Sequence, residues 1–177
     1  RIDALGPGAF LMAPNHLHHL FVEEWQLRYP AAQSWGTTEV IRKRPELGFE
    51  FSLNDTGPWP WADELDTLLF TGSRLMQECL FHHRASRTLI VTDFVENFSG
   101  AQFNRWQTLV ARFAGILAPR GRMPLDWRLS FLFNRREARA HLVTVLGWEP
   151  ERLVMAHGEI IETNATAFLE RSFAWLR

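Results

Sequence analysis

Several features that would assign a protein to a large functional class are scarce or missing in this sequence. It has one cysteine, Cys79, which excludes an intramolecular disulfide. No apolar run approaches the roughly 20 residues that a transmembrane helix needs. The sequence contains no Gly-x-Gly-x-x-Gly or Walker phosphate loop and no Gly-x-Ser-x-Gly nucleophile elbow. A disulfide scaffold is therefore excluded, and neither nucleotide binding nor serine-hydrolase chemistry has support.

Charge of one sign is also lacking, because the formal net charge is −1 and basic and acidic residues are interspersed. The densest basic run, Arg42-Lys43-Arg44, ends at Pro45 and Glu46, which is typical of a solvated loop. We therefore expect no nucleic-acid partner and no membrane partner. The single cysteine lies in an apolar run and predicts a buried, inert thiol, which fits a reducing compartment and a cytoplasmic protein.

The length of 177 residues and the 46% hydrophobic content are sufficient for one sizeable core. We expect a single domain over residues 1–177. Residues 1–8 resemble sequence from the middle of a domain, so we expect that upstream strands are missing from this piece. The eight tryptophans are consistent with a packed core, with apolar pocket walls or with a dimer face, and the oligomeric state stays open.

Hydrophobic periodicity predicts a βαβ unit at the start of the chain. The strand covers about residues 9–13, and a second short strand lies near residues 33–35. Between them we predict an amphipathic helix that ends at Tyr29-Pro30 and has the apolar positions Leu17, Leu20, Phe21, Trp25 and Leu27. Residues 36–64 are rich in proline and glycine and predict a long loop with one strand around residues 50–53.

The rest of the chain predicts strands followed by helices. The strands cover residues 65–71, 78–82 and 88–92, and the last two form a hairpin in which His83 faces Thr88 and Glu78 falls opposite Asp93. Helices follow at residues 102–117 and 134–146, then a short strand at 152–156 and a final helix, with Asn134 and Asn164 as N-caps. This alternation predicts an α/β fold.

Metal-capable side chains stand where apolar runs end. Asp93 ends the run 88–93, His157 follows the run 152–156, and a third run at residues 10–13 precedes His16, His18 and His19. Strand ends that meet at one sheet edge are where open α/β sheets build their sites, and carboxylate and imidazole suit Zn²⁺, Mn²⁺ or Fe. The alternatives stay open: Asp93 as a turn cap and His157 as a structural hydrogen-bonder.

The other histidines are harder to interpret. On an extended segment the rings of His16 and His18 would share one face, whereas helical spacing would separate them, and Asn15 or His16 is also a plausible N-cap. His82 and His83 fall at the hairpin tip, away from Asp93, and are interpreted as structural. His141, inside a predicted helix, is interpreted in the same way.

These segments resemble the metallo-β-lactamase superfamily. The resemblance runs through residues 13–21 (APNHLHHLF), 81–93 and 152–158, spans nearly the whole chain, and is greater to an uncharacterised branch known only as a domain of unknown function. It implies an αββα sandwich that holds one or two metals through a His-x-His-x-Asp-His motif, a middle histidine, a late aspartate and a last histidine. Asp93 matches that aspartate, and His157 matches the last histidine.

The motif is degenerate in this chain. Aligned on the histidines, His16 and His18 take the first two motif positions, and Leu20 and Phe21 replace the aspartate and the histidine after it. Aligned on the helix that ends at Pro30, the second position is Asn15, the aspartate is Leu17 and the final histidine is His18. Either alignment loses the motif aspartate, and the middle histidine is Ser73 or absent.

The resemblance therefore implies one divalent metal, zinc first, with iron or manganese not excluded, on ligands from the set His16, His18, Asp93 and His157. It implies a hydrolase acting on an ester, thioester or amide of a small-molecule substrate that the sequence does not identify. Glu78 would orient a ligand or accept a proton, and Asn15 would support the histidines. No catalytic residue is assigned, because the motif aspartate is lost. The alternative is a metal-free relative that serves as a binding or structural module.

Overall fold

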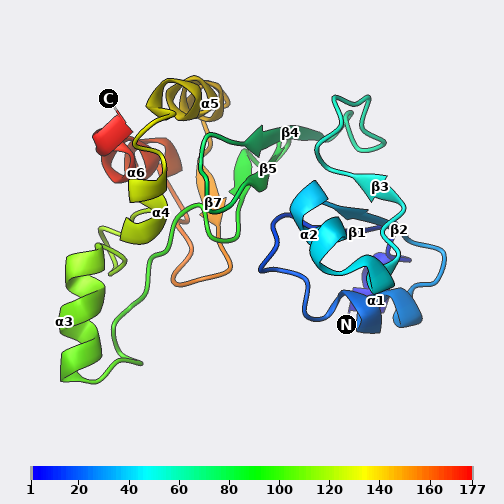
Figure 1. Ribbon diagram of the computed structural model, residues 1–177, viewed down its shortest axis with the longest axis horizontal. Helices are drawn as coiled ribbons and strands as arrows, with labels where there is room; N and C mark the ends of the chain where they lie inside the picture. Colours follow the sequence, from blue (N-terminus) through cyan, green and yellow to red (C-terminus); the bar gives the residue numbers. More distant parts are fainter. Residues whose placement is uncertain (1, 177) are drawn as a thin grey trace. The chain divides into compact units, whose positions relative to one another are not determined.

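The computed structural model describes residues 2–176 and divides into two compact units, Arg1–Gly57 and Pro58–Arg177 (Figure 1). Each unit has its own sheet, and each is described by itself. No helix in the described residues is long and apolar enough to cross a membrane.

The first unit is built on a three-stranded parallel sheet in the order β1-β2-β3. The helix between β1 and β2 confirms the predicted βαβ unit, and β3 confirms the strand expected near residues 50–53. A small core of Ala13, Val22, Val40 and Leu47 lies beside the sheet. The elements are β1 (Phe10–Ala13), α1 (Val22–Arg28), β2 (Gln33–Gly36), α2 (Thr38–Lys43) and β3 (Phe51–Ser52), with 3₁₀ turns at Ile2–Leu5 and Pro45–Leu47.

The predicted apolar face of the first helix is wrong. Helix α1 begins only at Val22, which is buried, whereas the five apolar residues expected to face the core are all exposed. The reason is local: the Asn15 side chain accepts backbone N–H groups and holds residues 15–21 in turns, which delays the helix. Helix α2 was not predicted, and Arg42 and Lys43 lie in its last turn, where their charges suit the helix dipole.

The second unit contains a four-stranded sheet in the order β4-β5-β6-β7. The pairs β4–β5 and β5–β6 are antiparallel, so the predicted hairpin is confirmed, including the pairing of His83 with Thr88. Strands β6 and β7 are parallel neighbours although about sixty residues separate them. Their carboxyl ends therefore open at the same edge of the sheet. The strands are β4 (Leu65–Phe70), β5 (Glu78–His83), β6 (Thr88–Ile90) and β7 (Arg152–Val154).

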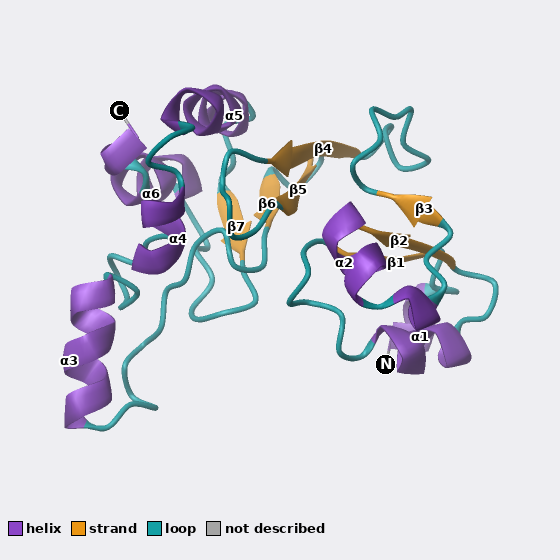
Figure 2. Cartoon of the chain, in the orientation of Figure 1, coloured by secondary structure: helices purple, strands orange, loops and turns teal. Residues whose placement is uncertain are grey.

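Three helices and a 3₁₀ turn cover this sheet (Figure 2): α4 (Leu125–Ser130), α5 (Arg135–Gly147), α6 (Ala165–Ser172) and Ala174–Leu176. At the centre of the core, the Phe70 ring lies edge-on to Phe94 with centroids 4.8 Å apart, and Phe94 stacks on Phe173 at 4.4 Å. All three rings are fully buried. Cys79 is buried too, which raises its pKa and confirms the inert thiol.

Helix α3 (Arg105–Ala114) lies apart from this core and projects away from the sheet (Figure 1). It is shorter than the predicted 102–117 because Asn104 caps its start reciprocally with Gln107 and Gly115 ends it at a left-handed φ of 77°. The prediction of Asn134 and Asn164 as N-caps of α5 and α6 is confirmed for their positions but not for their hydrogen bonds. Asn134 and Asn164 stand at the N-cap positions, but their side chains make no capping hydrogen bond.

Candidate metal site

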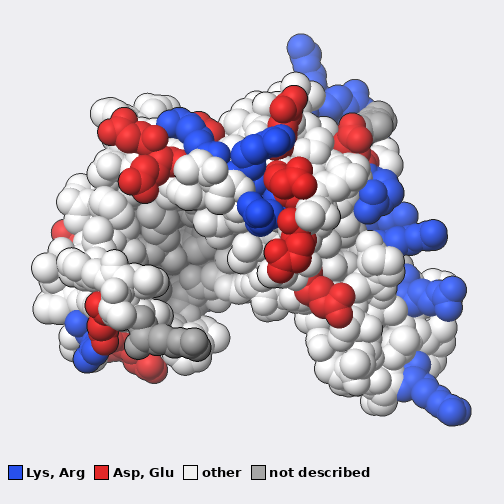
Figure 3. Space-filling view, turned by 180° about the vertical axis from the view of Figure 1, so that it is seen from behind, with Lys and Arg blue, Asp and Glu red and all other residues white. Residues whose placement is uncertain are grey.

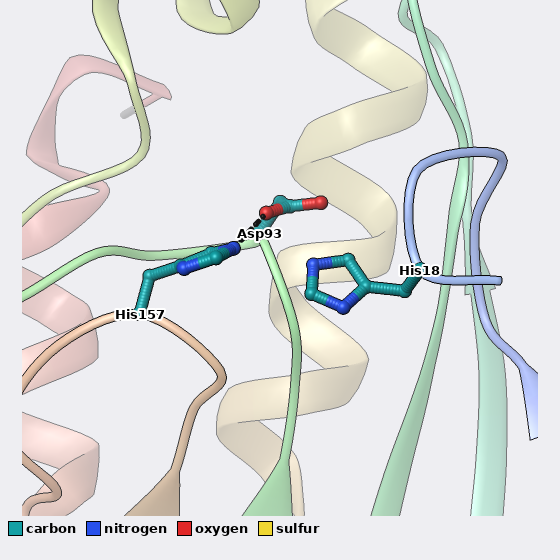
Figure 4. A group of neighbouring side chains, drawn as sticks. All are labelled: His18, Asp93 and His157. Atoms are coloured by element: carbon teal, nitrogen blue, oxygen red, sulfur yellow. Dashed lines mark ion pairs between the residues drawn. The ribbon is translucent and has the colours of Figure 1, made fainter. Parts of the chain in front are cut away.

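Asp93 and His157, predicted from two distant segments, meet in the second unit. His157 Nε2 lies 3.0 Å from Asp93 Oδ1, as the dashed line in Figure 4 marks. The Asp93 side chain is buried and that of His157 is 39% exposed, so the pair is reachable from solvent on the imidazole side. Each residue stands three positions beyond a strand, and the last strand residues, Ile90 and Val154, are register partners. The parallel pairing of β6 and β7 thus brings the two side chains together.

The backbone around His157 is fastened to the segment that follows Asp93. Asn97 N–H donates to the His157 carbonyl at 3.0 Å, and Glu159 N–H donates to the Asn97 carbonyl at 2.8 Å. Gly158, at a φ of 115°, makes this approach possible, because a Cβ there would lie 2.3 Å from the Asn97 carbonyl carbon. A glycine directly after a histidine is a sequence signal for such a close approach, because glycine has no Cβ and tolerates a positive φ, but the sequence does not identify Asn97 as the partner.

Glu78 supports Asp93 through the backbone. Its carboxylate is fully buried and accepts the N–H of Thr92 at 2.6 Å and that of Asp93 at 2.9 Å. The hairpin register predicted this proximity. Burial raises the pKa of Glu78 to about 7, and the neighbouring charge of Asp93 acts in the same direction.

Glu96, which sequence reasoning did not single out, adds a third acidic group. It is half-buried, and burial raises its pKa to about 7, with the charges of Asp93 and Asp126 contributing. Its only signal in the sequence is its position three residues after Asp93. Three carboxyl groups in one neighbourhood disfavour ionisation of one another, and a bound cation would relieve that cost.

The histidine turn, residues 15–19, belongs to the first unit. Asn15 is fully buried, and its Oδ1 accepts the N–H of Leu17 at 2.8 Å and that of His18 at 2.9 Å. The structure thus shows Asn15 shaping the turn that carries His18.

Two rings of the turn have partners within the first unit. His16 Nδ1 lies 3.1 Å from Glu39 Oε2, and His19 Nδ1 lies 2.9 Å from an Arg44 nitrogen. Burial lowers the pKa of His19, and the charges of Lys43 and Arg44 lower it further.

Other polar residues near strand ends have structural roles. Ser73, where the resemblance places the middle histidine, accepts the N–H of Leu75 and of Met76 and contacts Ser130 Oγ at 2.6 Å. It organises the turn after β4. His82 bonds Asp66 and stacks on Trp148, and His83 bonds Ser86, in agreement with the structural interpretation of this pair.

Comparison with known proteins gives one kind of match. No protein-family model matches the sequence, and no curated protein does. Among solved structures, the DIM-1 metallo-β-lactamase exposed to ceftazidime superimposes with a TM-score of 0.56 at 12% identity, over 94% of this chain and 66% of that one. The chain has a metallo-β-lactamase-like fold.

Two further structures agree. TMB-1 matches with a TM-score of 0.55 at 10% identity, over 97% of this chain and 72% of that one. A metallo-β-lactamase from Hirschia baltica matches with a TM-score of 0.53 at 10% identity, over 95% of this chain and 67% of that one. The metallo-β-lactamase-like chain therefore spans about two thirds of the length of these proteins. At these identities the likeness concerns the fold.

The donor chemistry of Asp93 and His157 fits a divalent metal. Two ligands on a tetrahedral Zn²⁺, each at about 2.0 to 2.1 Å, lie roughly 3.3 Å from each other. The observed 3.0 Å is close to that separation, and a carboxylate with an imidazole suits Zn²⁺, Mn²⁺ and Fe. The second unit therefore provides two donors whose spacing suits a shared ion.

Proposed function

We propose that this protein is a metal-dependent hydrolase that holds a single divalent metal ion on His18, Asp93 and His157, with zinc as the first candidate for the metal. The 3.0 Å separation of Asp93 and His157 at the ends of two parallel strands is the observation that carries the proposal. Each of the three residues offers one donor atom, an imidazole nitrogen or a carboxylate oxygen. Three protein ligands leave one position of a tetrahedral ion for water or substrate, as catalytic sites require.

His18 is proposed as the third ligand on grounds within its own unit. The alignment anchored on the helix that ends at Pro30 gives His18 the final histidine of the motif. His16 is the ligand that the other alignment would add, so the two alignments make different predictions for it.

A metal bound there would polarise a carbonyl and lower the pKa of a bound water towards about 7. Glu78 holds the Asp93 backbone in position through two N–H groups, which keeps the carboxylate aimed at its partner. Glu96, with a pKa raised to about 7, is able to give up or take a proton near neutral pH and is our candidate general acid-base group. The substrate class is a small-molecule ester, thioester or amide.

A metal-free structural or binding module is the second candidate, and the same pair of residues favours it. With His157 protonated, a 3.0 Å contact to Asp93 is a charge-assisted hydrogen bond that fastens the two loops without an ion. The two candidates differ in metal content and in the effect of ligand substitutions.

The test is the metal content of protein purified without chelators, measured by plasma mass spectrometry as purified and again after dialysis against a series of Zn²⁺ concentrations. We expect about one equivalent in the wild type and at least a roughly tenfold lower affinity in His18→Ala, Asp93→Asn and His157→Ala. His83→Ala is the matched control, because this histidine bonds Ser86 at the hairpin tip. Its metal content should equal that of the wild type.

His16→Ala separates the alignments: unchanged metal content supports His18 as the final motif histidine, whereas a loss supports His16 as a ligand. A wild type that takes up no metal would contradict the proposed metal-dependent hydrolase and favour the metal-free module. Iron in place of zinc would favour redox chemistry. Once metal is present, a panel of chromogenic esters, thioesters and amides tests the activity, and Glu96→Gln should lower the rate without lowering the metal content.

A further inference from the structure

Helix α3 exposes an apolar face that none of the described residues covers. Trp106 is 71% exposed and Phe113 is 78% exposed, and Leu109 and Val110 between them are exposed as well. The core cluster of the second unit draws on α4, α5 and α6 and includes no residue of α3. Only Ala111, on the opposite side of the helix, is buried. Large side chains point outward and the smallest points inward, the reverse of an ordinary surface helix.

The four exposed residues form one continuous stripe. At about 100° per residue, Trp106, Leu109, Val110 and Phe113 fall within an arc of roughly 100°, because they occupy positions i, i+3, i+4 and i+7. Arg105 and Arg112 lie together beside one edge of this stripe, and both are exposed. An apolar stripe with aromatic residues at its two ends and arginines at its border is the composition of helices that lie in the headgroup region of a bilayer.

The segment around α3 is basic, although the whole chain is not. From Asn104 to Arg139 the acidic residues are Asp126 and Glu137, and the basic residues are Arg105, Arg112, Arg120, Arg122, Arg128, Arg135, Arg136 and Arg139. Seven of these eight arginines are exposed. Figure 3 shows Lys and Arg side chains in a row down the right-hand edge. The net charge of −1, from which no membrane partner was expected, thus conceals a local excess of positive charge.

We propose that α3 binds the surface of an anionic membrane, with the stripe of Trp106, Leu109, Val110 and Phe113 in the headgroup and upper acyl region and the arginines on lipid phosphates. The positive charge of residues 104–139 is the observation that favours an anionic membrane as the binding partner of this stripe. A membrane surface with negative headgroups is complementary to it, whereas the same helix face of a second copy would present the same positive charge. The helix is far too short to span a bilayer and lies on it instead.

The test is flotation of the purified chain with vesicles of phosphatidylcholine alone and of phosphatidylcholine mixed with phosphatidylglycerol, each at low and high salt. We expect the chain to bind the anionic vesicles at low salt. Its affinity should be roughly tenfold lower for neutral vesicles, and roughly tenfold lower for anionic vesicles at high salt. Trp106→Ser combined with Phe113→Ser should lower binding roughly tenfold or more. Arg105→Gln combined with Arg112→Gln should reduce the difference between the two vesicle types.

Matched controls are Val143→Ser, an exposed apolar residue on α5, and Arg42→Gln, an exposed arginine of the first unit. Both should bind anionic vesicles as the wild type does. No binding to anionic vesicles, or equal binding by the α3 variants, overturns the proposal. The proposal is also overturned if the chain does not bind vesicles but self-associates on gel filtration, and the Trp106→Ser, Phe113→Ser double variant abolishes that self-association. The metal content of the Trp106→Ser, Phe113→Ser double variant should equal that of the wild type. The membrane test and the hydrolase test therefore succeed or fail separately.

Discussion

The two units hold their candidate metal ligands in contrasting ways. In the second unit, Asp93 and His157 stand beyond two paired strands above a large aromatic core, and Glu78 and Gly158 fix the loops that carry them. In the first unit, His18 lies on a turn beside a core of four aliphatic side chains, and that turn depends on the Asn15 side chain. The contrast teaches that strand pairing positions a ligand robustly, whereas a turn depends on a few polar contacts.

The largest expected effect comes from the aromatic core. Phe70→Ala should lower the unfolding free energy of the second unit by about 3 to 5 kcal/mol, because the ring is fully buried among Phe94, Phe131 and Phe173. Val40→Ala in the first unit removes less buried surface and should cost about 2 kcal/mol.

Hydrogen exchange measured on peptides from each unit reports these losses separately. Val143→Ala, at an exposed position of α5, is the control and should leave exchange in both units unchanged. If Val40→Ala proved as damaging as Phe70→Ala, the contrast between the two cores would be lost.

The next effect concerns the buried carboxyl that supports Asp93. Glu78 has a pKa of about 7 in the folded protein and its ordinary pKa of 4.5 in the unfolded chain. The folded state therefore binds more protons than the unfolded state between these two pH values. Stability contributed by the protonated carboxyl is therefore complete below about pH 4.5 and is lost as the pH rises towards 7. The loss amounts to about 3 kcal/mol, since each pKa unit corresponds to about 1.4 kcal/mol.

Glu78→Gln should flatten this dependence, because the amide does not ionise. Urea unfolding at a series of pH values from 4.5 to 8 measures it, and the wild type should lose its advantage over the variant as the pH rises. Glu96→Gln provides a comparison, because Glu96 has a pKa raised in the same direction but is only half-buried. Parallel pH profiles for the wild type and Glu78→Gln would contradict the assignment.

The smallest effect is expected at the histidine turn. Asn15→Ala removes the acceptor for two backbone N–H groups and should cost about 0.5 to 2 kcal/mol, as the loss of a helix cap does. If His18 is a metal ligand, the same variant should also weaken metal binding, because the turn no longer holds the imidazole in place.

Asn104→Ala is the matched variant in the second unit, since it removes the cap of α3. It should cost a similar free energy in thermal unfolding while leaving metal affinity, measured by titration calorimetry, unchanged. Equal metal affinity in Asn15→Ala and the wild type would show that the histidine turn does not depend on this side chain.

Much of the second unit was predictable from the sequence. Alternating apolar runs and the turn 83–87 specify β5, β6 and their register, and with it the proximity of Glu78 to Asp93. Periodicity also located α5 and α6. The first helix was predicted too early because a side chain that caps a turn overrides periodicity, and α2 was missed because six residues are too few for a recognisable pattern.

By itself, the sequence determined which residues have metal-capable or acid-base chemistry, and that two of them follow apolar strands, because strand periodicity and side-chain chemistry are local properties. The tertiary structure alone decided that β6 and β7 are neighbours, that Gly158 lets the Asn97 backbone approach His157, and that Glu96 lies near Asp93 in a half-buried setting. These facts depend on contacts between residues distant in the chain and on burial, which the whole fold creates and no local pattern contains.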